Sequence, residues 1–206
     1  MSTGLLWLLV ASGFGAVAAR RPAVAAVLVT SQTLLLGAGA LAMAPGRSGE
    51  FAVAAGLLML KAVLVTAIVA VAIRRSREAR PHADESGLLV RLGAAVVLVL
   101  VMVALVPEYG LESVAAERGA TALIATALAL VLVRRPILFA VLAFLIAENG
   151  IAVAAVSVSG ALPLIVEAGI AFDLVLLIGV AAIFQRRILA AFGTTDSSVM
   201  QGGARG

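Results

Sequence analysis

The sequence predicts an all-α membrane protein, a polytopic bundle of about seven transmembrane helices. Two observations predict this class. Hydrophobic residues make up 63% of the 206 residues and charged residues only 13%, a composition that soluble domains of this size do not have. The apolar residues also form long runs between short polar segments, and about 20 apolar residues suffice to cross a bilayer. The alternating pattern of a membrane β-barrel is absent from these runs.

The composition also excludes several kinds of site. The chain contains no cysteine, which excludes disulfides, thiolate-bound iron–sulfur clusters and cysteine zinc sites. Its single histidine, His82, excludes a haem held by two histidines of this chain. The net charge of +4 does not indicate nucleic-acid binding, because the basic residues follow membrane topology instead. We therefore expect no metal, no cofactor and no nucleic-acid partner.

The first two helices are expected at 4–19 and 22–44. No Lys or Arg precedes the first apolar run, and Arg20 and Arg21 follow it. A secretory signal peptide has the reverse charge order, so the first helix is expected to remain uncleaved, with its N-terminus outside. Gln32 lies near the middle of the second helix, where an amide side chain usually hydrogen-bonds to a neighbouring helix.

The middle of the chain supplies three further helices and two polar loops. A lysine, Lys61, lies inside the first of these helices. The longest polar loop follows that helix at 74–86, and a second loop at 107–118 contains three glutamates. The three helices are expected at 51–73, 88–106 and 119–133.

The last two helices form a hairpin, with apolar segments at 136–158 and 163–185 joined by a short turn. A polar, glycine-containing tail at 189–206 follows and is expected to be poorly ordered. We therefore expect a single transmembrane domain at 1–188 and a cytoplasmic tail.

The basic residues predict the orientation. With the N-terminus outside and the C-terminus inside, only Arg47 and Arg118 fall outside, and Lys61 lies within the membrane. This sorting follows the positive-inside rule. The remaining arginines all fall inside: Arg20, Arg21, Arg74, Arg75, Arg77, Arg80, Arg91, Arg134, Arg135, Arg186, Arg187 and Arg205.

Three carboxylates lie inside the last two apolar segments: Glu148, Glu167 and Asp173. A charge near the centre of a membrane helix costs about 2.5–3.5 kcal/mol on insertion scales, so three cost roughly 7–10 kcal/mol. That sum is comparable to the stability of an ordinary domain. Asn149 adds another polar group beside the first carboxylate. We therefore expect a function for this hairpin.

The topology predicts the depths of these groups. Folding the hairpin near 160–161 places Asp173 level with Glu148. Glu167 lies roughly 9 Å nearer the outer face, at about 1.5 Å per helical residue. Lys61 lies about ten residues from the outer end of its helix, at the depth of Glu148. Three ionisable groups are thus expected near the midplane, and a fourth nearer the outside.

Two interpretations of these groups remain open. A low-dielectric surrounding disfavours charged forms, so carboxylates there can take up and release protons. Chains of acids and lysines facing a wet interior relay protons in membrane proteins, and Glu148, Glu167, Asp173 and Lys61 are our candidates for such a path. Alternatively, Lys61 neutralises one acid in a structural ion pair that fixes helix packing. Such a pair leaves the other acids unexplained.

Two motifs carry a resemblance to a known family. The run AENGI at 147–151 and the run PLIVEAGIAFDLVLLIG at 163–179 resemble the hydrogenase-4 component E family, and the lysine of the third helix agrees. The part at 119–187 also resembles the NuoK-type subunit of complex I, which has three helices, N-out and C-in, with a glutamate on each of the last two. Glu148 matches the first glutamate, and Glu167 or Asp173 would be the second.

The resemblance implies a membrane subunit of a redox-driven ion pump in a bacterial or archaeal cell membrane. Antiporter-like and other membrane subunits would be its neighbours, and soluble redox subunits would dock on the cytoplasmic side. The resemblance also implies that electrons pass through those other subunits, which fits the lack of cofactor ligands in this sequence. Three functions stay open: a proton-conducting subunit, a structural subunit of the same complex, and an independent small proton-coupled transporter.

Overall fold

The computed structural model describes residues 2–46, 48–75, 87–107, 110–111, 113–134, 137–158 and 169, and the regular secondary structure in these ranges is α-helical. The chain divides into two compact units, Met1–Val166 and Glu167–Gly206. Of the second unit, only Gly169 is described. No strand occurs in the described ranges, so the all-α class is confirmed for them.

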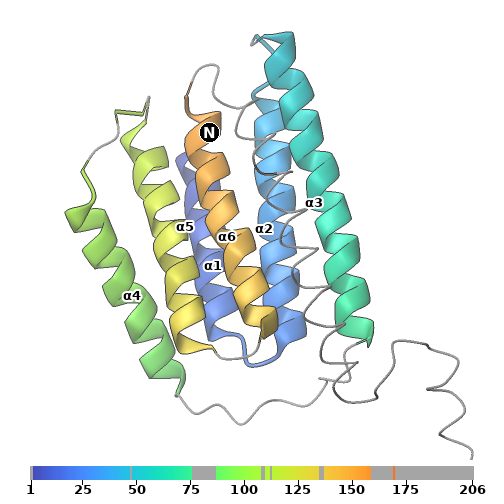
Figure 1. Ribbon diagram of the computed structural model, residues 1–206. Coiled ribbons are helices and arrows are strands. Elements are labelled where there is room, and N and C mark those ends of the chain that lie inside the picture. The colour runs from blue at the N-terminus through green and yellow to red at the C-terminus, as the bar shows by residue number, and fades with distance from the viewer. Residues whose placement is uncertain are drawn as a thin grey trace, which may run out of the picture. The chain divides into compact units, whose positions relative to one another are not determined.

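The described residues of the first unit form six helices, and Figure 1 shows them lying side by side, with consecutive helices running in opposite directions. The odd-numbered helices therefore begin at one end of the bundle and the even-numbered helices at the other. Their bounds are α1 Thr3–Ala18, α2 Pro22–Ala42, α3 Gly49–Arg75, α4 Leu88–Leu105, α5 Val114–Val133 and α6 Ile137–Val156.

Four of these helices, α2, α4, α5 and α6, are long and apolar enough to cross a membrane, and α1 is a shorter apolar helix. Large apolar side chains also cover the outside of the bundle. Leu89 is 85% exposed, Leu132 77% and Trp7 64%. Such a surface suits contact with lipid hydrocarbon rather than water. The described helices therefore support a helical membrane protein.

The start of the fifth helix was predicted wrongly. We expected a loop up to residue 118, whereas α5 begins at Val114. The Ser113 side chain accepts a hydrogen bond from the Ala116 backbone N–H at 3.4 Å, and this N-cap starts the helix early. Glu117 therefore lies in the first turns of α5 and is buried, with 5% of its surface exposed. The other described helix ends differ from prediction by at most about two residues, which is ordinary fraying.

Several expectations lie outside the described residues. These are the seventh helix at 163–185 apart from Gly169, the tail at 189–206, His82, and the acids Glu167 and Asp173. The expected domain boundary at residue 188 lies there too.

Four helices form the middle of the bundle. α1 packs against α2 and α5, and α6 packs against α5 and α2. α3 lies against α2, and α4 lies against α5 and α1, so these two helices occupy opposite edges (Figure 1).

Hydroxyl groups inside the helices bond to the backbone of their own helix. Thr30, Thr66 and Thr126 each donate to the carbonyl four residues earlier. In an apolar surrounding this bond satisfies the hydroxyl without a partner helix. These threonines therefore need no functional explanation.

α5 and α6 approach each other closely at Gly150. A Cβ at this position would lie 3.0 Å from the Ala120 carbonyl oxygen and 3.1 Å from the Leu123 Cβ. Because one of these neighbours is backbone, the two helices can approach this closely only with glycine here.

We expect Gly150→Ala to lower the free energy of unfolding by about 1–3 kcal/mol, because the added methyl group must push α5 and α6 apart. Reversible unfolding by SDS in mixed micelles measures this change. Gly93→Ala on α4 is the matched control, since a Cβ there meets nothing within 4 Å. Equal stability of the two variants would contradict the close contact.

Candidate functional site

An ion pair joins α3 to α6 inside the bundle. The Lys61 ammonium on α3 pairs with the Glu148 carboxylate on α6. The two side chains are only 11% and 15% exposed. α3 packs mainly against α2, so the long lysine side chain reaches past that contact to α6. The structure thus brings together two of the four predicted proton-path residues.

The pair lies well away from the ends of its helices. Glu148 is eight residues before the end of α6, or roughly 12 Å along the axis, and Lys61 is farther from both ends of α3. An isolated charge at such a position in hydrocarbon is costly. Each charge of the pair therefore compensates the other.

An amide network lies beside the ion pair. The Asn149 side-chain nitrogen donates to the Gln32 side-chain oxygen at 2.8 Å and to the Thr33 hydroxyl at 3.0 Å. The Gln32 nitrogen donates in turn to the Leu9 carbonyl at 2.7 Å. All three polar side chains are buried, with exposed fractions of 3% or less. The network therefore connects α6, α2 and α1 in the middle of the bundle.

The Leu9 carbonyl is the end of this network and accepts a further bond from the Ser12 hydroxyl at 2.7 Å. Gly13 of α1 lies next to this bond and packs closely on α5, because a Cβ there would lie 3.2 Å from a Thr126 methyl group. Polar groups thus extend from α3 through α6 and α2 to α1.

Glu148 and Asn149 are consecutive, and their side chains serve different neighbours. Successive helical residues point about 100° apart, which is enough to place one side chain towards α3 and the next towards α2. The sequence identified Asn149 and Gln32 as supporting polar residues. It did not identify Thr33, because a threonine in a membrane helix ordinarily bonds only its own helix. The Thr33 hydroxyl does donate a hydrogen bond to the Val29 carbonyl of its own helix, and it also accepts one from the Asn149 side chain.

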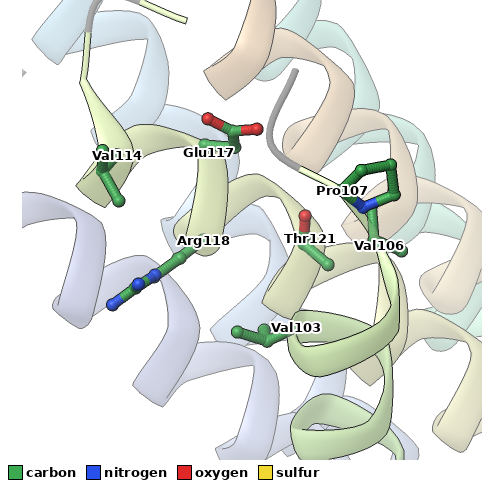
Figure 2. Close-up of a pocket in the computed structure, with 7 residues that line it drawn as sticks. All are labelled: Val103, Val106, Pro107, Val114, Glu117, Arg118 and Thr121. Atoms are coloured by element: carbon green, nitrogen blue, oxygen red, sulfur yellow. The ribbon is translucent and has the colours of Figure 1, made fainter. Parts of the chain in front are cut away.

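A small pocket opens between α4 and α5 at the end where the odd-numbered helices begin (Figure 2). Its volume is about 60 Å³, space for a few water molecules. The buried Glu117 and Thr121 supply polar groups from α5. The pocket is lined by Val103, Val106, Pro107, Val114, Glu117, Arg118 and Thr121.

The pocket and the ion pair belong to different sides of the bundle. Glu117 lies on the α4 side of α5, whereas Lys61 and Glu148 lie where α3 meets α6. Sequence reasoning missed Glu117 because it assigned this residue to a loop. Within the described ranges, no group of three or more His, Cys, Asp or Glu side chains could hold a metal ion.

Comparison with protein-family models, with curated proteins and with solved structures gives no match. A function therefore has to be argued from the chemistry of the site and from the sequence motifs.

Removing one member of the ion pair leaves an uncompensated charge in the bundle. We expect Lys61→Gln and Glu148→Gln each to lower the free energy of unfolding by about 3 kcal/mol, and the double variant to lose less than either. SDS unfolding of the four proteins in mixed micelles measures the coupling. Additive losses would show that the two side chains do not interact.

The amide network predicts a ranking of two nearly isosteric variants. Asn149→Leu removes both bonds to α2 and is expected to lower the free energy of unfolding by about 1–2 kcal/mol. Thr33→Val is expected to cost about 0.5 kcal/mol, because the Asn149–Gln32 bond remains. The same unfolding measurement tests the ranking, and the reverse order would contradict this arrangement of hydrogen bonds.

Proposed function

We propose that this chain is a membrane subunit of a hydrogenase-4- or complex I-like respiratory assembly, and that it contributes intramembrane carboxylates to a proton path beside antiporter-like subunits. The observation that carries the proposal is the Lys61–Glu148 pair, an acid and a base in contact inside an apolar bundle. The run at 147–151, which contains Glu148, and the run at 163–179 supply the family resemblance.

The pair has the chemistry that proton transfer needs. Passing a proton from the ammonium to the carboxylate converts two charges into two neutral groups, and the net charge of the site stays the same. A proton that arrives from a neighbouring group instead neutralises Glu148 and leaves Lys61 without its counter-charge. The lone Lys61 ammonium then favours release of a proton to the next group of the path, because an unpaired charge is disfavoured in this apolar surrounding. Acids and lysines in such contact form relays in membrane proteins.

The amide network has a positioning role in this proposal. Side-chain amides stay neutral near neutral pH and neither hold nor lose a proton, so Asn149 and Gln32 are not steps of the path. Their bonds fix the rotation of α6 about its axis and hold Glu148 towards α3.

The proposal includes the topology of seven helices, N-out and C-in. Its support is the positive-inside sorting of the arginines. In this topology Glu167 or Asp173, on the segment at 163–185, is the second carboxylate of the path. The segment at 74–86 and the tail would face soluble redox subunits in the cytoplasm of a bacterium or archaeon.

A second candidate function is a structural subunit of the same complex, and the ion pair also favours it. A pair that only holds α3 to α6 needs no proton exchange, and buried pairs of this kind fix register in some proteins. An independent small transporter is the third candidate. The Glu117 pocket does not serve it, because its volume of about 60 Å³ is far below the roughly 300–1,000 Å³ of ordinary ligand sites.

The association of this chain with other subunits is tested first. The tagged chain, extracted in mild detergent, is expected to co-purify with antiporter-like subunits and with hydrogenase- or quinone-linked subunits, identified by mass spectrometry. Recovery of the chain alone or as a homo-oligomer would refute the complex and favour the independent transporter.

Proton pumping by membrane vesicles that contain the intact complex then separates the two complex-based functions. We expect Glu148→Gln to reduce pumping to background while electron transfer continues. The Lys61→Gln/Glu148→Gln variant is expected to recover stability but not pumping. Glu50→Gln is the matched control, because Glu50 is exposed in the first turn of α3. Normal pumping by the double variant would support the structural function.

A further inference from the structure

Three arginines lie at the end of the bundle where α1 and α5 end: Arg20 and Arg21 between α1 and α2, and Arg134 directly after α5. Arg134, at the end of α5, donates from its guanidinium to the Ala19 carbonyl and lies over the Phe139 ring, 4.5 Å from the ring centroid. Only 7% of Arg134 is exposed. Ala19 directly precedes Arg20 and Arg21, so the bond places the Arg134 guanidinium beside the backbone segment that carries these two arginines. We call this group the arginine cluster.

Arg20 and Arg21 are exposed. Within the described part of the chain, neither forms an ion pair. The first turn of α2, which follows them, contains no acidic residue. The described acids Glu50 and Glu117 lie at the opposite end of the bundle, where α3 and α5 begin. The described residues thus leave net positive charge at this end.

The position of the arginine cluster indicates which kind of anion it can bind. α2 and α5 are long enough to cross a membrane, so their ends lie at the level of the lipid headgroups. Guanidinium groups bind phosphate oxygens through paired hydrogen bonds. Apolar side chains flank the cluster on the outer surface, with Val24 48%, Val27 62% and Leu132 77% exposed. A ligand with a phosphate and an acyl chain matches both the guanidinium groups and the exposed apolar side chains.

We propose that the arginine cluster binds the headgroup of an anionic phospholipid. The phosphate lies against Arg20 and Arg21, and the acyl chains lie along the exposed apolar side chains of α2 and α5. Arg134 holds the two turns together through Ala19 and adds its charge from behind. Basic sites between membrane helices recognise lipid phosphates in this way. The site is independent of the proton path.

Native mass spectrometry of the purified full chain in mild detergent tests the site. Phosphatidylglycerol and phosphatidylcholine with matched acyl chains are titrated separately. We expect preferential binding of phosphatidylglycerol and an apparent affinity about 30-fold lower in Arg20→Gln/Arg21→Gln, from two charges near the headgroups. Arg118→Gln is the control and is expected to bind like the wild type, because Arg118 is exposed at the other end of α5.

Three results would overturn the proposal. These are equal binding of the two lipids by the wild type, an unchanged preference in the double variant, or the same loss in Arg118→Gln. Wild-type preference that persists at high salt would also refute it, because screening weakens exposed charge contacts, and that measurement requires no variant. Co-purification of an acidic protein that depends on Arg20 and Arg21, without a lipid preference, would assign the cluster to a protein partner instead.

Discussion

Polar groups buried between membrane helices have no water to bind, and this constraint governs the interior of the bundle. Thr30, Thr66 and Thr126 satisfy this constraint by hydrogen bonds within their own helices. Asn149 and Gln32 cannot do so and bond across helices instead. Each such bond is modest, with an average of about 0.6 kcal/mol in a measured membrane protein. Their main effect is directional, because they fix which faces of α6, α2 and α1 meet.

The same constraint connects packing to the candidate chemistry. α6 presents a carboxylate towards α3, an amide towards α2 and, at Gly150, bare backbone towards α5. These three consecutive residues therefore contact three different neighbours. A rotation of α6 that improved one contact would disturb the other two. The Lys61–Glu148 ion pair is thus held in place by contacts between uncharged groups.

The sequence predicted the described helices well, because long apolar runs are the strongest signal in a membrane chain. It also placed Lys61 and Glu148 at one depth, which required only counting along helices. It could not predict that Asn149 would meet Gln32 and Thr33, since the relative rotation of two helices depends on packing. The Ser113 cap and the burial of Glu117 were missed because a polar stretch before an apolar run resembles a loop. The Arg134 bond to Ala19 joins residues far apart in sequence and required the assembled bundle.

The ion pair also has a consequence for biosynthesis. Lys61 belongs to the third helix to leave the ribosome and Glu148 to the sixth. At about 5–20 residues per second, the lysine is made several seconds before its partner. During that interval α3 must enter the bilayer with an unneutralised amine or wait beside the insertion machinery. By contrast, Gln32 finds its acceptor at Leu9 in the helix made just before it. The α1–α2 hairpin can therefore mature early, whereas Lys61 of α3 gains its Glu148 partner only when α6 arrives.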